Sequence, residues 1–386
     1  MTRILLFSET DIITAVILKG MISDFCDMMG GCALEYKLVR YVTDEDLNVF
    51  DVVICVRGES PLSTELMKKA KKAGCFVIFF LDDDLLHLPS KTFRFPLRKK
   101  HLLNGLKYAD GFLTSNQLLA EEYIPLIAGN RWGVLETSIS EEEVFLRQEE
   151  ETDVVKIVYA GASTHVAQWR DFIAPVWPQL AQKYGGRLSL TFVGMHPDMP
   201  KENYGAKVTF VEGMPLEKFR KYMAREKFDI GLSPLISNHF TERKYYNKYL
   251  EYARCGACGI YSNCPPYTLI IRDRENGFLV NNTSEDWLKV LEEVIENALL
   301  RWNCIHASQQ HMLSKFTKQN VFTQLAKDFP ELKQYKAPHK TKVSINICAR
   351  FNQKMFRFVE RLYLTIFAFL SFGPKETLRR IKNKLK

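Results

Sequence analysis

The chain has 386 residues, of which 46% are hydrophobic and 25% are charged. This balance is typical of a folded protein with room for two domains, and it excludes disordered, collagen-like and very small disulfide-stabilised proteins. No apolar run reaches the roughly 18 to 20 residues that a membrane-spanning helix needs. The start, Met1-Thr2-Arg3 before a short apolar run, does not resemble a signal peptide, so we expect a cytoplasmic protein.

The positive charge is concentrated in the tail. Residues 331–386 hold fourteen Lys and Arg against three acidic residues, a net +11, whereas the first 330 residues hold 39 against 42, a net −3. The body lacks a basic stripe with interleaved aromatic residues, so we expect no nucleic-acid partner. The nine cysteines are odd in number and scattered, which favours reduced core thiols over a disulfide framework.

The first half alternates apolar strands with helices. Strands are predicted at residues 4–7, 52–56, 76–81 and 111–114, and helices at 12–29, 63–73, 101–108 and 116–123. Apolar strands between helices indicate a parallel sheet that is buried on both faces.

A second strand and helix series follows an acidic stretch. Residues 140–153 contain seven acidic residues and are predicted to form a solvated linker. Behind it we predict strands at 156–161, 188–193, 208–211, 228–232, 259–262 and 276–280, and helices at 169–183, 215–224, 247–254 and 285–300. The pattern predicts an α/β protein with two Rossmann-like, doubly wound domains, at residues 1–150 and 151–330, and a tail at 331–386.

The segment 228–280 carries the most informative motifs. A strand ends in Ser233-Pro234, a helix reads KYYNKYLEYA at residues 244–253, and a turn contains Asn276-Gly277. This order resembles the donor-binding half of GT-B glycosyltransferases, most closely bacterial members of glycosyltransferase family four. The resemblance covers roughly residues 105–300. It implies an acceptor-side first domain, a donor-side second domain, retention of anomeric configuration and no cofactor beyond the nucleotide-sugar co-substrate.

Charged residues on the 247–254 helix fit a nucleotide-sugar donor. A helix N-terminus favours phosphate, and Lys244 and Lys248 would add positive charge there. The resemblance implies that Glu251 takes the ribose hydroxyls, and Tyr252 belongs to the same motif. Arg243 stands where family four often has a first glutamate, which places the sugar contact in doubt. An ordinary amphipathic surface helix is the alternative interpretation.

The turn after the strand at 156–161 supplies the predicted reacting centre. Gly161 allows a close backbone approach, and Ser163 or Thr164 can cap the next helix. The resemblance implies that this turn faces the donor phosphates, with Gly161 and His165 as catalytic residues and Ser163 and Thr164 as donor contacts. A structural role for a single histidine is the alternative.

Asp82, Asp83 and Asp84 follow the apolar strand at 76–81. They resemble the Asp-x-Asp motif with which GT-A glycosyltransferases hold a divalent metal ion, which would make the chain a single metal-dependent domain. The second strand series argues against this, so we expect no metal. Contacts to acceptor hydroxyls and loop capping remain the two interpretations of these carboxylates.

The tail combines apolar and basic residues. Residues 351–370 are rich in Phe, Leu and Ile, and six Lys and Arg follow between 375 and 386. This pattern favours an amphipathic helix on an anionic membrane surface, at residues 351–386, and a peripheral position at the inner face of the plasma membrane. Packing against the body or a partner is the alternative.

The sequence therefore predicts a hexosyltransferase-type enzyme that moves a sugar from a nucleotide-sugar donor to a cell-envelope glycan, with a lipid-linked acceptor as one option. The donor base, the acceptor and the oligomeric state are not specified. Two alternatives remain: a non-catalytic GT-B subunit, which the missing first glutamate favours, and a sugar-nucleotide epimerase of the same fold. Cys255 and Cys258 lack a second pair for a zinc site, so we interpret them as core thiols.

Overall fold

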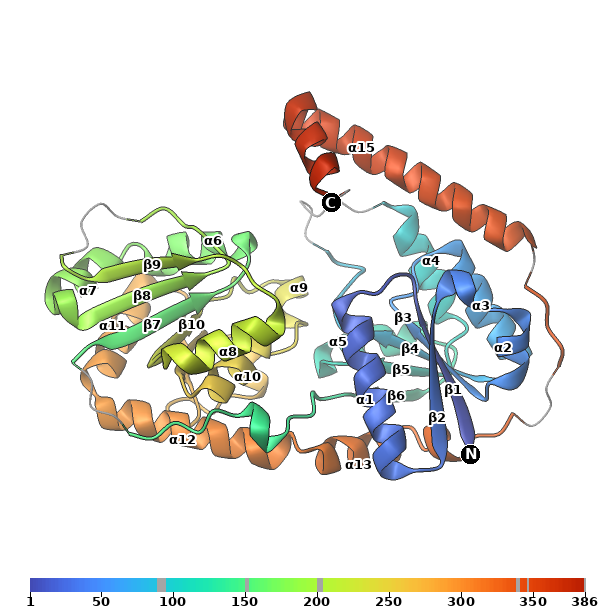
Figure 1. The fold of residues 1–386 in the computed structure, drawn as a ribbon, viewed down its shortest axis with the longest axis horizontal. Helices are drawn as coiled ribbons and strands as arrows, with labels where there is room; N and C mark the ends of the chain where they lie inside the picture. The colour runs from blue at the N-terminus through green and yellow to red at the C-terminus, as the bar shows by residue number, and fades with distance from the viewer. Residues whose placement is uncertain (89–94, 150–152, 200–203, 338–340, 346, 385–386) are drawn as a thin grey trace. The chain divides into compact units, whose positions relative to one another are not determined.

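The chain forms two compact units in the computed structural model, shown in Figure 1. Unit 1 consists of residues 1–137 and 321–386, and unit 2 of residues 138–320. The structure describes the whole chain except residues 89–94, 150–152, 200–203, 338–340, 346 and 385–386, and also leaves out the side chains of residues 164, 347 and 370–384.

Unit 1 is a six-stranded parallel sheet with helices on both faces. Its strands, in spatial order, are β2 (Cys32–Leu38), β1 (Thr2–Ser8), β3 (Val52–Val56), β4 (Phe76–Leu81), β5 (Gly111–Thr114) and β6 (Arg131–Val134). Successive residues of each central strand point to opposite faces of the sheet, so they belong to two separate hydrophobic cores. One core contains α3 (Pro61–Lys72), α4 (Leu97–Leu106) and α5 (Gln117–Tyr123), and the other contains α1 (Ile13–Met29) and α13 (Lys318–Asp328). The short helices α2 (Asp44–Val49) and α14 (Glu331–Gln334) and the long α15 (Ile347–Lys384) complete the unit.

Unit 2 repeats this architecture. Its parallel strands, in spatial order, are β12 (Phe278–Val280), β11 (Cys258–Ser262), β10 (Ile230–Ser233), β7 (Val155–Ala160), β8 (Leu188–Val193) and β9 (Lys207–Val211). One face packs against α7 (Trp177–Tyr184), α11 (Ser284–Glu296) and α12 (Ala298–Lys315), and the other against α8 (Leu216–Glu226) and α10 (Asn247–Cys255). Shorter helices lie at α6 (Val166–Gln168) and α9 (His239–Glu242). The predicted pair of Rossmann-like domains is confirmed.

The strand order fixes where each unit can bind a ligand. In unit 1 the order reverses between β1 and β3, and in unit 2 it reverses between β7 and β10. Helices leave to opposite faces at such a reversal, so a crevice opens beyond the carboxyl ends of the two strands. In each unit, residues that bind a ligand are therefore expected close to this point.

Two strands that the sequence analysis missed lie at the edges of the first sheet. β2 and β6 are the outermost strands, and both mix exposed or partly exposed residues with few buried ones. An edge strand has one neighbour and one solvated side, so its sequence lacks the apolar run on which the other predictions depended. The helix predicted at 285–300 also ends earlier, because Asn297 accepts a hydrogen bond from the backbone N–H of Leu300 and starts a new helix there.

The predicted solvated linker is anchored in its middle. Arg147 is 5% exposed, donates a hydrogen bond of 2.7 Å to Asp229 and also binds the carbonyl oxygen of Phe228. Residues 138–149 therefore belong to unit 2, and the boundary lies at 137 rather than 150. The chain returns to unit 1 at residue 321, so the tail is part of that unit rather than a separate region.

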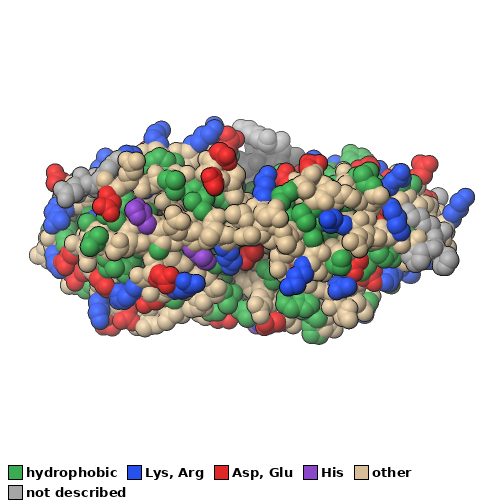
Figure 2. All heavy atoms as spheres, turned by 90° about the horizontal axis from the view of Figure 1, so that it is seen from below, with side chains coloured by type: hydrophobic (Ala, Val, Ile, Leu, Met, Phe, Trp, Pro, Cys, Tyr) green, Lys and Arg blue, Asp and Glu red, His purple; other side chains and the backbone are tan. Residues whose placement is uncertain are grey.

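The surface drawn in Figure 2 carries acidic and basic side chains side by side, with hydrophobic residues between them, and the described side chains there form no stripe of one sign. This matches the nearly neutral body of the chain. Cys255 and Cys258 are both buried free thiols, as the core interpretation requires.

Candidate active site

The point at which the strand order of unit 2 reverses lies next to Gly161, the residue that follows β7. A Cβ atom at Gly161 would lie 2.9 Å from Cε of Met195 and 3.0 Å from Cγ of His165. A side chain at this position would require Met195 and His165 to shift, so glycine suits the tight approach of the turn to the strand end. The turn brings His165 beside the end of β7, and the Tyr159 hydroxyl donates a hydrogen bond of 2.9 Å to the carbonyl oxygen of His165.

His165 lies close to both predicted phosphate lysines. Burial, together with the positive charges of Lys248 and Lys244, lowers the pKa of His165 to about 4. The imidazole is therefore neutral at physiological pH. Two separate segments of the sequence therefore meet at this point. His165 follows the carboxyl end of β7, and Lys244 and Lys248 lie beyond β10.

Lys248 is half-buried in the first turn of α10. Burial lowers its pKa to about 8, although the carboxylate of Glu251 acts in the opposite direction. A partly desolvated cation at a helix N-terminus favours a bound anion, because the anion replaces the lost hydration and the peptide N–H groups add positive potential. The arrangement fits a diphosphate.

Glycine and asparagine residues hold α10 in place. A Cβ atom at Gly231 in β10 would lie 2.5 Å from the Tyr252 ring, so the helix packs directly on the strand. Asn276 in the Asn-Gly turn donates hydrogen bonds to the Tyr249 hydroxyl at 3.2 Å and to the carbonyl oxygen of Ile270 at 3.3 Å. The motifs that carried the family resemblance therefore support the helix that bears Lys248.

Glu251 forms ion pairs within unit 2. Its carboxylate accepts hydrogen bonds from Arg220 at 3.3 Å and Arg254 at 3.0 Å. The cavity beside these side chains has a volume of about 30 Å³, which holds a water molecule but not a ribose. A ribose at this carboxylate would have to compete with both arginines for Oε1.

The remaining donor-side residues differ in how accessible they are. Tyr252 is fully buried, and its hydroxyl donates a hydrogen bond of 2.6 Å to the carbonyl oxygen of Leu232, so this conformation leaves it no exposed polar atom for a ligand. Arg243 donates a hydrogen bond of 3.0 Å to the carbonyl oxygen of His239. Ser163 is exposed at the start of the turn, and the Thr164 side chain lies outside the described residues.

A second site lies in unit 1, at the reversal between β1 and β3. A cavity of about 310 Å³ is lined by residues that follow β1, β3 and β4 and by residues of the α4 region: Glu9, Thr10, Ile12, Val56, Arg57, Glu59, Asp83, Leu85, Leu88 and Arg98. Its volume is at the lower end of the range of about 300 to 1,000 Å³ that is usual for ligand pockets. We call it the unit 1 pocket.

Arg57 links the unit 1 pocket to the predicted acidic residues. Its Nε donates to Asp82 at 2.5 Å and its Nη2 to Asp83 at 2.9 Å. The Arg57 backbone has φ +48°, in the left-handed region that non-glycine residues avoid. Backbone strain of this kind clusters at functional sites.

The three aspartates have different surroundings. Asp82 and Asp83 face Arg57, and Thr14 donates a further hydrogen bond of 2.6 Å to Asp82. Asp84 is fully buried and accepts hydrogen bonds from the Tyr123 hydroxyl at 2.9 Å and from the backbone N–H of Leu86 at 3.2 Å. Asp84 thus caps its loop, and a metal ion at Asp82 and Asp83 would have to compete with a guanidinium for the same oxygen atoms.

Sequence reasoning missed four charged residues of the unit 1 pocket: Glu9, Arg57, Glu59 and Arg98. The first three had a usable signal, since they stand within three residues of the ends of β1 and β3. Polar residues directly after buried parallel strands gather at one edge of the sheet. Arg98 gave no such signal, because it is brought to the pocket by packing of α4.

The fold defines the class of protein. Sucrose-phosphate synthase from Thermosynechococcus elongatus superposes with a TM-score of 0.60 at 12% identity, over 86% of this chain and 99% of that chain. HepE from Anabaena in complex with UDP gives 0.60 at 11% identity, over 86% and 100%. The lipopolysaccharide outer core galactosyltransferase WaaB gives 0.59 at 16% identity, over 86% and 99%. The chain therefore has the GT-B glycosyltransferase fold.

The family comparison falls on unit 2. Residues 155–297 match the model of the family Glycosyl transferases group 1. No curated protein matches the chain significantly in sequence. The resemblance drawn from the 228–280 motifs is confirmed, and the matched span contains Gly161, His165, Lys244, Lys248 and Glu251.

Proposed function

We propose that the protein is a retaining, metal-independent glycosyltransferase that moves a hexose from a nucleotide-sugar donor to a glycan of the cell envelope. The observation that carries the proposal is the cluster of His165, Lys244 and Lys248 at the strand reversal of the group 1 domain. One neutral imidazole and two cations, one of them at a helix N-terminus, suit a diphosphate leaving group.

A uridine diphosphate sugar is the donor to test first. HepE has been solved with UDP, with UDP and glucose, and with UDP-glucose, and WaaB is a galactosyltransferase. In this proposal Lys244 and Lys248 bind the phosphates, the backbone at Gly161 and the hydroxyls of Ser163 and Thr164 approach them, and Arg243 lies at the donor sugar. Glu251 gives up its ion pair with Arg220 and binds the ribose hydroxyls instead.

The reaction needs little covalent chemistry from the protein. The bond between the sugar C1 atom and the diphosphate oxygen breaks, the acceptor hydroxyl oxygen bonds to C1, and the hydroxyl proton passes to the departing phosphate oxygen. The lysines stabilise the negative charge that develops on the diphosphate. Neutral His165 can donate one hydrogen bond to the reacting sugar or phosphate.

The acceptor sugar is assigned to the unit 1 pocket. Carboxylates and guanidinium groups are suitable partners for sugar hydroxyls, and Glu59, Asp83 and Arg98 line this pocket. Among the described residues, one carboxylate oxygen of Glu9 is buried without a hydrogen-bond partner, so a sugar hydroxyl could satisfy it.

Membrane association through residues 351–386, at the inner face of the plasma membrane, is part of the same proposal. Within the described residues, no helix is both long enough and apolar enough to cross a bilayer. α15 nevertheless exposes a set of large apolar side chains: Phe351, Met355, Phe358, Val359, Leu362, Ile366, Phe367 and Phe369. An exposed apolar helix face followed by a basic segment suits an anionic membrane surface.

One observation favours a second candidate, a non-catalytic GT-B subunit. Arg243 occupies the position of the first family-four glutamate and binds the backbone of α9. A subunit of this kind could keep the nucleotide site without transferring a sugar.

The experiment measures thermal stabilisation and slow donor hydrolysis by the full chain with UDP-, GDP-, dTDP- and CDP-sugars, each with EDTA and with magnesium. We expect stabilisation and hydrolysis with one nucleotide class in EDTA, and a marked decrease of both in Lys248→Gln. Lys221→Gln is the matched control, because Lys221 is an exposed lysine of unit 2 that pairs with Glu217. Stabilisation without hydrolysis would favour the non-catalytic subunit, and no stabilisation by any nucleotide would reject the donor site.

A further inference from the structure

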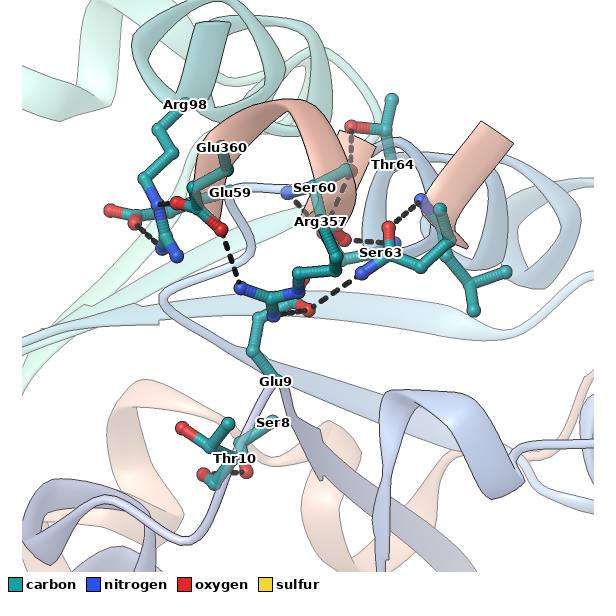
Figure 3. A network of polar contacts seen from close by, with 12 residues as sticks. Ser8, Glu9, Thr10, Glu59, Ser60, Ser63, Thr64, Arg98, Arg357 and Glu360 are labelled. Atoms are coloured by element: carbon teal, nitrogen blue, oxygen red, sulfur yellow. Dashed lines mark hydrogen bonds and ion pairs between the residues drawn. The ribbon is translucent and has the colours of Figure 1, made fainter. Parts of the chain in front are cut away.

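The C-terminal helix α15 makes direct polar contacts with residues of the unit 1 pocket. Glu9 accepts a hydrogen bond of 2.8 Å from Nη2 of Arg357 and one of 3.3 Å from Nε2 of Gln353. Glu9 lines the pocket directly after β1, 348 positions earlier in the chain than Arg357. Figure 3 shows the Arg357 guanidinium reaching Glu9 from the helix.

A second link runs through Arg98. Glu360, one helical turn after Arg357, accepts hydrogen bonds from Arg98 and, at 3.0 Å, from Arg357. Arg98 also donates to Glu59 at 2.8 Å. Arg98 and Glu59 both line the pocket, so two residues of α15 hold three pocket residues in one chain of ion pairs (Figure 3).

The carboxylates of this network are shielded from water. The side chains of Glu59, Glu360 and Glu9 are 7%, 6% and 12% exposed. Burial alone would raise the pKa of Glu360, but the guanidinium groups of Arg98 and Arg357 outweigh it and lower this pKa below its ordinary value. Shielded charge pairs hold their geometry more firmly than exposed ones, and removing one partner leaves a buried charge without compensation.

Aromatic packing fixes the helix above the pocket. Phe356 is 6% exposed. The centroid of its ring lies 5.3 Å from the ring centroid of Phe95 and 5.3 Å from that of His101. Tyr363 lies 5.5 Å from Phe95. Phe95 precedes α4, the helix that carries Arg98, so the same contacts locate Arg98.

The opposite side of α15 is apolar and exposed. Phe358 is 63% exposed and Leu362 is 51% exposed, and they directly follow Arg357 and Arg361 in sequence. In sequence, the segment 375–386 contains six Lys and Arg and one acidic residue, Glu376. This charge complements anionic lipid headgroups, whereas a second copy of the chain would bring the same positive tail against itself.

We propose that α15 is a positioning element that couples a bilayer surface to the unit 1 pocket. Its inward residues Arg357 and Glu360 hold Glu9 and Arg98 in place, and its outward residues rest on anionic lipid. The pocket therefore takes the sugar of a membrane-anchored acceptor at the bilayer surface. This inference rests on the proposed function for the identity of the pocket's ligand and for the membrane association of α15.

Hydrogen–deuterium exchange of the full chain tests the coupling, with and without vesicles of phosphatidylglycerol and phosphatidylcholine. We expect vesicles to protect residues 351–369 of the wild type and to slow exchange at residues 8–12 by about tenfold. Arg357→Ala should raise exchange at residues 8–12 by about tenfold without vesicles, and Arg357→Lys should restore much of the protection. Phe358→Ser is the matched control on the opposite face. It should match the wild type in solution and lose the response to vesicles.

Four outcomes would overturn the inference. Unchanged exchange at residues 8–12 in Arg357→Ala would reject the positioning role, and vesicle protection that stops at α15 would reject the coupling. Absence of vesicle binding, or a dimer in sedimentation velocity that Phe358→Ser dissociates, would reject the lipid surface. UDP binding is measured in parallel, so that a failure of the donor site is distinguished from a failure of this inference.

Discussion

Lys248 shows how a single residue connects local structure to donor binding. It is half-buried at the N-terminus of α10, and burial lowers its pKa from 10.5 to about 8. The residue therefore titrates close to physiological pH, whereas an exposed lysine does not. A bound diphosphate would favour the charged form, because it supplies the counter-charge that water cannot.

UDP affinity should consequently fall as the pH rises through 8. Above this pH the free protein loses the Lys248 proton that the complex retains, so affinity should decrease by up to about tenfold per pH unit. Calorimetric titration with UDP between pH 6.5 and 9.5 measures this change in affinity. Lys248→Gln should bind UDP about tenfold more weakly at pH 7 and lose the dependence, and Lys221→Gln should retain it. An unchanged pH profile in Lys248→Gln would show that another group is responsible.

Without ligand, Lys248 should make the stability of the protein rise with pH, which is opposite to its effect on UDP affinity. The folded-state pKa of Lys248 is lower than that of the unfolded chain, so the unfolded chain binds more protons between pH 8 and 10.5. The contribution of Lys248 to the free energy of unfolding therefore rises with pH in this window. Denaturant titrations should show a constant difference in the free energy of unfolding between the wild type and Lys248→Gln below pH 8. Between pH 8 and 10.5 this difference should shift in favour of the wild type.

At the scale of the element, the contact between α10 and β10 determines where Lys248 lies. Gly231 leaves no room for a Cβ atom, which would meet the Tyr252 ring at 2.5 Å. Both Gly231 and Tyr252 are buried, so neither can move away without disturbing the core of unit 2.

Gly231→Ala should therefore displace α10 and weaken UDP binding as well as stability. The expected loss in the free energy of unfolding is about 1 to 3 kcal/mol, which is typical of an overpacked core. Gly20→Ala is the control, because a Cβ atom there meets nothing within 4 Å inside α1. This control should be neutral or stabilising, since alanine favours a helix. Denaturant unfolding and UDP titration measure both effects, and a fully stable Gly231→Ala with normal UDP affinity would contradict the packing argument.

The segment before β7 depends on one buried ion pair. Arg147 and Asp229 have side chains that are 3% and 7% exposed, with Nη2 and Oδ1 separated by 2.7 Å. Asp229 also accepts a hydrogen bond from the backbone N–H of Lys156. The pair therefore fixes the segment to the start of the central strands of unit 2.

Arg147→Ala should destabilise unit 2 by about 3 to 5 kcal/mol, because it leaves the Asp229 carboxylate buried without its partner. Lys221→Ala, which breaks an exposed pair with Glu217, should have a far smaller effect, because solvent screens exposed pairs. Calorimetric unfolding of the two variants makes the comparison. Equal effects would mean that the buried pair adds no more than a surface pair.

At the scale of the whole molecule, the tail is part of the core of unit 1. Val343 and Ile345 are 7% and 5% exposed and belong to the same hydrophobic cluster as β1, β3 and β4. Val343 also exchanges hydrogen bonds with the Asn48 side chain through its backbone. A separate tail would leave these residues in solvent.

Truncation after residue 336 should therefore lower the unfolding temperature of unit 1 while unit 2 still binds UDP. The physical reason is that removal of Val343, Ile345 and Phe356 exposes the apolar surface that they cover. Scanning calorimetry, with and without UDP, measures the two transitions. If the truncated chain unfolded as the full chain does, the tail would be peripheral to unit 1.

The sequence by itself determined the parallel α/β architecture, because buried strands such as Val52–Val56 and Phe76–Leu81 are apolar throughout and alternate with helices. It did not determine the edge strands β2 and β6, whose solvated sides remove that pattern. Local motifs also predicted Gly161, His165, Lys244 and Lys248 as candidate site residues, since each stands next to the end of a strand or helix.

Only the tertiary structure decided which charges meet. Glu9 and Arg357 are 348 positions apart, and Arg98 and Glu360 are 262 positions apart. No local pattern encodes such pairs, because they depend on how α15 and α4 pack against the sheet. In the same way, Arg220 pairs with Glu251, and Tyr252 buries its hydroxyl, through contacts that exist only once β10, α8 and α10 are assembled.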